Sequence, residues 1–305
     1  MCPLPALAAY FAVVFIGGAL LAPWLYQLVQ WLAAAFPGLQ ALANNPFHRY
    51  LNRSLMVLGL LGLWPFLRSI GLRSWKDVGL ESLAGNWRKV AFGCLLGFGS
   101  LACVAGCAVL GGARQLNLDH SGLELWRHLR NATLAAAFVA LLEELFFRGV
   151  LLGALRKTCH RATAVILSSA VYALLHFFQR PEAPEAIEWS SGLMVLAGML
   201  RGFGELEHLV PGFFTLTLAG IILAVAYLRT GTLFFSIGLH AGWIFWLKSY
   251  GFITQEHTGA KVWFWGSGKL TDGWLALIIL LLVCFAVARF PLNNKVGGLS
   301  QKQKA

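Results

Sequence analysis

The chain reads LAAAFVALLEELFFRGVLLGAL from residue 134 to residue 155. Apart from Glu143, Glu144 and Arg148, every side chain in this block is apolar or a glycine. A helix needs about 20 mostly apolar residues to cross a bilayer. In lipid, each backbone amide must be hydrogen-bonded within its own helix or within a closed barrel, and the block lacks the alternation of barrel strands. It is therefore predicted to be a transmembrane helix.

Blocks of this kind recur along the whole sequence. Of the 305 residues, 58% are hydrophobic and only 12% are charged, whereas about a quarter of the residues in soluble domains are charged. Residues 193–200 are apolar but too few to cross, so we expect an interfacial or re-entrant segment there. The sequence therefore predicts an all-α, polytopic transmembrane bundle of about eight helices. The predicted spans are residues 6–30, 54–72, 90–110, 134–155, 161–179, 210–228, 231–250 and 273–290.

The charged residues indicate how these spans are oriented. Basic residues lie in the links 71–89 and 156–161 and in the C-terminal tail, whereas Glu182, Glu185 and Glu188 follow the fifth span. Counting the spans puts these three basic segments on one face and the acidic segment on the other, and the positive-inside tendency assigns the basic face to the cytoplasm. We therefore expect an integral, multi-pass membrane protein with both termini in the cytoplasm. The same tendency accounts for the net charge of +11, so we do not expect nucleic acid as a partner.

Two smaller features fit a membrane protein. The N-terminal apolar stretch has no basic residue ahead of it and no convincing cleavage site before Pro23, so we expect a retained first span. The cysteines show no CxxC spacing and four of them lie within apolar blocks, which favours buried free thiols. They are Cys2, Cys94, Cys103, Cys107, Cys159 and Cys284.

Ionisable side chains at membrane depth cost about 2.5–3.5 kcal/mol on insertion scales, so they mark candidate functional sites. Glu144 precedes Arg148 by four residues, which predicts an ion pair on one helix face. Glu143 points about 100° away from Glu144, so we do not expect the two carboxylates to share a partner. A carboxylate outside the ion pair suits a proton acceptor. The alternative is that both glutamates belong to one salt-bridge network that stabilises helix packing.

Two histidines lie at a depth similar to that of Glu143. Measured along the helices from the nearest basic residue, Glu143 lies about 20 Å deep, His176 about 22 Å and His240 about 16 Å. A lone histidine in a helix is more often a core residue than a catalyst. Three helices that bring ionisable groups to one depth indicate a shared site instead.

The same residues carry a family resemblance. EELFFR matches an EExxxR pattern; Tyr172 and His176 follow as an aromatic-xxx-His pattern, and His240 comes next within TGTLFFSIGLHAGW. In this order, each on a predicted transmembrane block, the motifs resemble those of the CPBP (CAAX protease and bacteriocin-processing, or Abi) membrane proteases, which include the Ras-converting CAAX endopeptidase. The resemblance covers about residues 130–250, and Tyr172 is a supporting residue within it.

This resemblance implies an intramembrane endopeptidase of the CAAX-protease-like type. Glu143, matching the first glutamate of the motif, would act with His176 to activate a water molecule. His240 would stabilise the oxyanion, whereas Glu144 and Arg148 would be structural or orienting. The implied organisation is N-terminal helices with a basic linker over residues 1–89, a catalytic core over residues 90–250, and a C-terminal helix with a basic tail over residues 251–305.

The sequence departs from the family at one position. Similar proteins usually have asparagine four residues after the last histidine, where this chain has Ile244. Loss of one oxyanion donor typically lowers the rate by about 10²–10³. Ser236 lies four residues before His240 on the same helix face, so we expect that its hydroxyl can help.

The residue types leave a metal site open as an alternative. Glu143, His176 and His240 together form a ligand set known from catalytic zinc sites. The local HExxH spacing of such sites is missing. We therefore favour a glutamate-type mechanism without a cofactor, and keep zinc as the alternative.

The expected partners are the lipid bilayer and, by family precedent, a membrane-anchored or lipid-modified peptide or protein. Ile244 favours a different interpretation, a catalytically weak or inactive scaffold or bacteriocin-immunity-type protein. Transport through a Glu/His cluster is a third hypothesis, but the sequence lacks the internal repeat that is typical of transporters.

Overall fold

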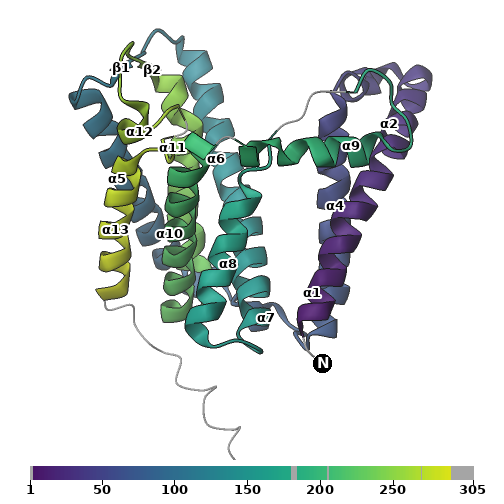
Figure 1. The fold of residues 1–305 in the computed structure, drawn as a ribbon, viewed down its shortest axis with the longest axis horizontal. Coiled ribbons are helices and arrows are strands. Elements are labelled where there is room, and N and C mark those ends of the chain that lie inside the picture. The colour runs from purple at the N-terminus through teal and green to yellow at the C-terminus, as the bar shows by residue number, and fades with distance from the viewer. Residues whose placement is uncertain (1–2, 180–183, 205, 269, 290–305) are drawn as a thin grey trace, which may run out of the picture. The chain divides into compact units, whose positions relative to one another are not determined.

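The computed structural model describes residues 3–179, 184–204, 206–268 and 270–289. Within these ranges the chain is almost entirely helical, with one two-stranded antiparallel sheet (Figure 1). This confirms the predicted all-α class. Several residues discussed above, Cys2, Glu182 and the basic tail after residue 290, lie outside the described part of the chain.

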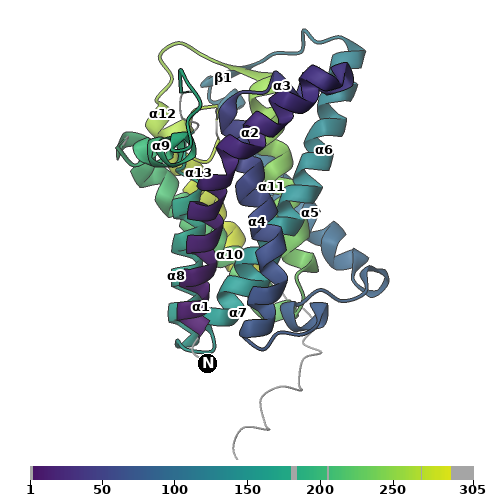
Figure 2. The same cartoon turned by 90° about the vertical axis from the view of Figure 1, so that its right-hand side faces the viewer.

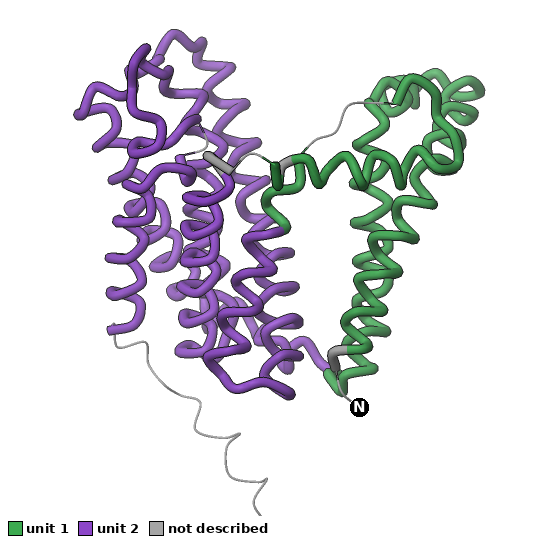
Figure 3. Tube along the Cα trace, in the orientation of Figure 1, with its two compact units in different colours: residues 1–73, 175–206 green, residues 74–174, 207–305 purple. Residues whose placement is uncertain are grey.

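The chain divides into two compact units, drawn in different colours in Figure 3. Unit 1 comprises residues 1–73 and 175–206, and unit 2 comprises residues 74–174 and 207–305. The predicted division into three segments stays a prediction.

Unit 1 is built from helices that pack through small residues. α2 lies against α4, and the short α9 packs across both (Figure 1). A Cβ atom on Gly192 of α9 would lie only 1.8 Å from the carbonyl oxygen of Ala19, so this approach requires glycine. The helices are α1 (Pro3–Ala12), the π-helical η1 (Val13–Gly17), α2 (Gly18–Ala35), η2 (Pro37–Leu39), α3 (Gln40–Ala43), α4 (Phe47–Ser69), α9 (Ser191–Gly198) and η6 (Met199–Gly204).

Unit 2 is a helical bundle that contains both strands. Its hydrophobic core lies between α5, α10, α11 and α13 and includes Leu101, Leu223, Leu239 and Leu280. Its elements are η3 (Trp75–Val78), η4 (Leu83–Gly85), α5 (Trp87–Leu110), β1 (Arg114–Leu116), α6 (Gly122–Glu144), the π-helical η5 (Leu145–Leu152), α7 (Gly153–Leu155), α8 (Arg161–Leu175), α10 (Leu206–Thr230), α11 (Phe234–Ile253), β2 (Thr254–Glu256), α12 (Val262–Trp265) and α13 (Trp274–Arg289). The last residue of α8 and the first of α10 are counted with unit 1.

Among the described helices, four are long and apolar enough to cross a membrane. They are Pro5–Ala35, Phe47–Ser69, Trp87–Leu110 and Leu209–Thr230, which correspond to the first, second, third and sixth predicted spans. Shorter apolar helices accompany them, α8 and α13 among them. The chain is therefore a helical membrane protein. The count of eight spans and the orientation of the termini stay predictions.

A close crossing of α5 and α11 organises unit 2, and α6 also packs against α11 (Figure 2). The crossing uses two glycine pairs at i, i+4 spacing, Gly93 and Gly97 on α5 and Gly238 and Gly242 on α11. A Cβ atom on Gly97 would lie 2.1 Å from the carbonyl oxygen of Leu239. Spacing of the GxxxG kind lets two membrane helices approach until their backbones touch. The crossing therefore fixes the height and rotation of α11, the helix that carries His240.

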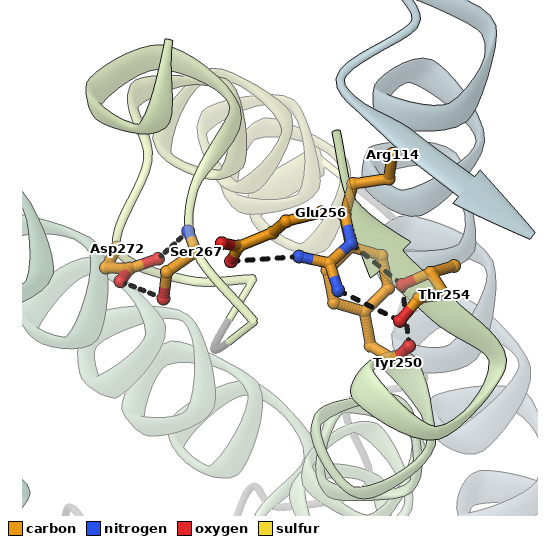
Figure 4. A network of polar contacts seen from close by, with 6 residues as sticks. All are labelled: Arg114, Tyr250, Thr254, Glu256, Ser267 and Asp272. Carbon is orange, nitrogen blue, oxygen red and sulfur yellow. Dashed lines mark hydrogen bonds and ion pairs between the residues drawn. The ribbon is translucent and has the colours of Figure 1, made fainter. Parts of the chain in front are cut away.

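A polar network closes one end of this bundle (Figure 4). Arg114 is buried, and its Nε donates to the Thr254 hydroxyl at 2.8 Å. Its Nη1 lies 3.1 Å from Glu256, and its guanidinium lies 4.6 Å from the centroid of the Tyr250 ring. A buried guanidinium needs most of its donors satisfied. Arg114 therefore anchors the strand after α5 to the strand after α11.

The turn between α12 and α13 has its own carboxylate anchor, also shown in Figure 4. Asp272 accepts hydrogen bonds from the Ser267 backbone at 2.8 Å and from its hydroxyl at 2.6 Å. Gly266 has φ +84°, a value that glycine adopts without strain. The turn is therefore held locally, apart from the Arg114 network.

Candidate active site

The helix that carries both glutamates begins at a capping box. The Ser121 hydroxyl accepts the Glu124 backbone N–H, and the Glu124 carboxylate accepts the Ser121 N–H at 2.9 Å. Hydrogen bonds from the Ser121 backbone and then from its side chain lower the pKa of Glu124. The α-helical part ends at Glu144 and continues as the π-helical η5. Single π-helical turns inside α-helices are frequent at functional sites.

Glu144 is the centre of the buried polar cluster. Its Oε1 lies 2.9 Å from Nη1 of Arg148, which confirms the ion pair that the spacing predicts. The same oxygen lies 2.9 Å from Nδ1 of His240, on α11. The Glu144 side chain is fully buried, and its partners are nearly so. A charged-group cluster of this kind is stable only while every partner is present.

Arg148 extends the cluster to two further helices. Its Nη2 donates to the Gly220 carbonyl of α10 at 3.3 Å. Its guanidinium lies 4.7 Å from the centroid of the Tyr172 ring of α8, in cation–π geometry. A Cβ atom on Gly220 would lie 2.8 Å from the Cβ of Ser169, so the close approach of α10 to α8 here requires glycine. Arg148 thus holds α8 and α10 to the helix that carries the glutamates.

His240 presents its two ring nitrogens to two consecutive glutamates. Nδ1 faces Glu144, whereas Nε2 lies 3.8 Å from Oε2 of Glu143. The expectation that the two carboxylates do not share a partner is therefore wrong. They share this ring because an imidazole offers a nitrogen on each of two edges. A carboxylate oxygen accepts, so Nδ1 donates to Glu144, which leaves Nε2 directed at the Glu143 side of the site.

Tyr172 adds a hydroxyl at the same ring edge. Its Oη lies 3.3 Å from Nε2 of His240. A small cavity of about 30 Å³ borders both side chains and Trp243. A site needs roughly 10–15 Å³ to hold one water molecule, so there is room for a water beside the imidazole. The cavity is also lined by Leu101, Thr215, Leu216, Ala219, Leu247, Thr271 and Leu280.

Three other predicted residues have different surroundings. His176 follows the last residue of α8 and belongs to unit 1. Its part in the site therefore stays a prediction. Ser236 is fully buried, and its hydroxyl donates to the Leu233 carbonyl one turn earlier at 2.9 Å. Ile244 packs in an apolar cluster with Ala136 and other residues of α6.

Sequence reasoning missed the residues that position His240. Trp243, one turn further along α11, donates its indole N–H to the Ser100 hydroxyl at 2.9 Å. Ser100 in turn donates to the Gly97 carbonyl at 2.8 Å. The i, i+4 glycine spacing on α5 and on α11 is the sequence signal that could have identified this contact.

The zinc alternative depends on His176. Within the residues that the structure describes, no three His, Cys, Asp or Glu side chains are grouped so as to hold a metal ion. His176 belongs to unit 1 and the other two proposed ligands belong to unit 2, so a zinc site from Glu143, His176 and His240 stays a prediction. Zinc therefore stays the alternative that the sequence suggested.

Comparisons with known proteins agree with the predicted resemblance. Residues 125–246 match the family described as Type II CAAX prenyl endopeptidase Rce1-like. The chain is also 24% identical over 210 residues to the uncharacterized protein YyaK of Bacillus subtilis (strain 168). That alignment covers 66% of this chain and 61% of the relative, so the chain spans about three fifths of that protein. No solved structure matches. Residues 125–246 of this helical membrane protein are thus similar to the Rce1-like domain of type II CAAX prenyl endopeptidases.

Proposed function

We propose that this protein is an intramembrane endopeptidase that cleaves a membrane-anchored or lipid-modified peptide or protein. The observation that carries the proposal is the pairing of Glu143 with His240 across α6 and α11. Their facing atoms lie 3.8 Å apart inside the Rce1-like region. A water molecule held by Glu143 would therefore lie beside the ring nitrogen that donates to the oxyanion.

In the proposed reaction, Glu143 acts as the general base. Its carboxylate takes a proton from the water, with His176 as the second group acting on that water. The water oxygen bonds to the scissile carbonyl carbon, and the carbonyl π electrons move to the carbonyl oxygen. The oxyanion then re-forms the C=O bond as the C–N bond breaks; the electron pair of that bond stays on nitrogen, and Glu143 returns the proton to the departing amine. Atoms and charge balance without a cofactor.

The oxyanion is assigned to Nε2 of His240, the ring nitrogen that faces Glu143. His240 would donate from Nε2, and Glu144 would stabilise the charged ring through Nδ1, 2.9 Å away. Tyr172 would supply a second donor, because its hydroxyl lies 3.3 Å from Nε2. Ser236 is a weaker candidate, since its hydroxyl already donates to a backbone carbonyl. Preorganised donors of this type account for much of the rate enhancement in acyl transfer.

The test is cleavage of a membrane-peptide library by the purified full chain in proteoliposomes, compared with Glu143→Ala. Glu81→Ala is the control, because Glu81 is an exposed glutamate of unit 2 that lies outside the site. Cleavage that is present in the wild type and in the control but lost in Glu143→Ala supports the proposal. Cleavage that persists in Glu143→Ala refutes it.

One observation favours a non-catalytic scaffold as the second candidate. Ile244 lies among the apolar side chains of α6 and α11 where related proteases usually have asparagine. In this case the same peptides bind to the wild type and to Glu143→Ala with equal affinity, and neither protein cleaves them.

A further inference from the structure

An apolar groove runs along the surface of unit 2 between α8 and α10, away from the Glu143–His240 pair. Its volume is about 350 Å³. The two helices run antiparallel, since Gly220 of α10 lies against Ser169 of α8, and later residues of α10 line the same groove as earlier residues of α8. The groove is lined by Ala162, Val165 and Ile166 from α8, by Ile221, Val225 and Leu228 from α10, and by His160 and Arg161 at one end.

The walls of the groove are continuous apolar stripes. Ala162, Val165 and Ile166 are spaced i, i+3, i+4, and the residues of α10 are spaced i, i+4, i+7, so each set lies on one helix face. The stripe on α10 extends over about 10 Å of helix rise. It lies within Leu209–Thr230, one of the helices that is long and apolar enough to cross a membrane. The groove therefore opens where lipid chains are the surrounding medium.

One end of the groove is strongly basic. The link before α8 reads RKTCHR from residue 156 to residue 161, and it contains no acidic residue. Arg156, Lys157, His160 and Arg161 are all exposed. The groove thus combines an apolar channel with a cationic end, which complements an amphiphile that has an acyl chain and a negative head group. Basic pockets between membrane helices commonly hold anionic lipid head groups.

We propose that this groove binds an anionic phospholipid, with an acyl chain between α8 and α10 and the phosphate on Arg161 and His160. A peptide is a poor occupant, because its backbone amides would find no partners along apolar walls. An acyl chain needs no hydrogen-bond partners. The site is independent of the proposed peptidase reaction.

The experiment measures lipid binding to the delipidated full chain in detergent by native mass spectrometry, with phosphatidylglycerol and phosphatidylcholine of identical acyl chains as probes. We expect phosphatidylglycerol to bind more tightly. Arg161→Ala should weaken phosphatidylglycerol binding roughly fivefold, which corresponds to about 1 kcal/mol for one cation near the head group. Phosphatidylcholine binding should change little in that variant.

Matched variants separate the channel from its cationic end. Ala162→Phe fills the groove from an exposed position, so it should weaken binding of both lipids, whereas Leu167→Phe on the same helix lies outside the groove and should leave binding unchanged. Arg127→Ala removes an exposed charge from α6 and serves as the charge control.

The proposal is overturned by equal binding of the two lipids, by an equal loss in Arg161→Ala and Arg127→Ala, or by unchanged binding in Ala162→Phe. Full competition by glycerol phosphate would also overturn it, because a head group without a chain would then suffice. Glu143→Ala should bind phosphatidylglycerol as the wild type does, so failure of the peptidase proposal leaves this test intact.

Discussion

Glu144 on α6 accepts a 2.9 Å hydrogen bond from Nδ1 of His240 on α11. The same carboxylate oxygen pairs with Arg148, so one buried anion serves a histidine and an arginine at once. Removing one member of a buried ion pair costs about 3–5 kcal/mol, because its partner is left charged and unsatisfied. Because Glu144 pairs with both His240 and Arg148, we expect the cluster to be required for folding as well as for orienting the imidazole.

We expect Glu144→Ala to lower thermal stability strongly in detergent, by an amount in the range of about 3–5 kcal/mol. The double variant Glu144→Ala/Arg148→Met should lose less than the sum of the two single variants, because it leaves no arginine charge behind. Thermal unfolding of the four proteins checks this. Strictly additive losses would contradict the shared-cluster interpretation.

Glu143 is predicted to matter for cleavage and not for stability, the opposite of the expectation for the folding of Glu144 variants. Its side chain is 27% exposed, whereas that of Glu144 is fully buried. Glu143→Gln keeps the shape and removes the base, so we expect little change in the unfolding temperature. Peptide cleavage should fall by about 10²-fold or more, the range for loss of a general base. A stable protein that still cleaves at the wild-type rate would remove Glu143 from the mechanism.

The close crossing of α5 and α11 leads to a separate prediction about stability and cleavage. Gly97→Ala would place a methyl group 2.1 Å from the Leu239 carbonyl, so the helices must move apart. Overpacking typically costs about 1–3 kcal/mol, and a backbone obstacle relaxes less easily than a side chain. We expect lower stability together with reduced cleavage, because α11 carries His240. Both are measured on the purified chain.

Gly99→Ala is the control on the same helix, since nothing lies within 4 Å of a Cβ there. It should leave stability and cleavage essentially unchanged. Equal effects of the two alanines would show that glycine flexibility, rather than close approach, is what matters at these positions.

Much of the fold and of the buried cluster could be predicted from residue spacing along single helices. The i, i+4 relation between Glu144 and Arg148 predicted their ion pair correctly, and the apolar blocks predicted the helical class. That the two glutamates share His240 could not be predicted, because His240 belongs to α11 and the contact depends on how that helix is rotated against α6. The Ser236 hydroxyl shows the same limit, since facing the right side of a helix does not decide between a distant partner and the Leu233 carbonyl.

Metal content gives a further prediction. Because HExxH spacing is missing, we expect purified active protein to contain zinc far below one equivalent and to keep its activity after dialysis against a chelator. Elemental analysis alongside the cleavage assay checks this. Stoichiometric zinc that is lost in Glu143→Ala would reverse the preference for a glutamate-type mechanism.

The second oxyanion donor is the point at which the sequence departs from the pattern of the family that it resembles, and the proposed donors Tyr172 and Ser236 lead to opposite predictions there. Tyr172→Phe removes the hydroxyl that lies 3.3 Å from Nε2 of His240 but keeps the ring beneath the Arg148 guanidinium. If this hydroxyl substitutes for the missing asparagine, kcat should fall by about 10²–10³ with little change in KM, since the contact forms only with the oxyanion. Ser236→Ala should leave kcat nearly unchanged, because the serine proton is already used within α11. The reverse pattern, a large loss of kcat in Ser236→Ala and none in Tyr172→Phe, would identify Ser236 as the second oxyanion donor. Its hydroxyl would then have to break its hydrogen bond to the Leu233 carbonyl during the reaction.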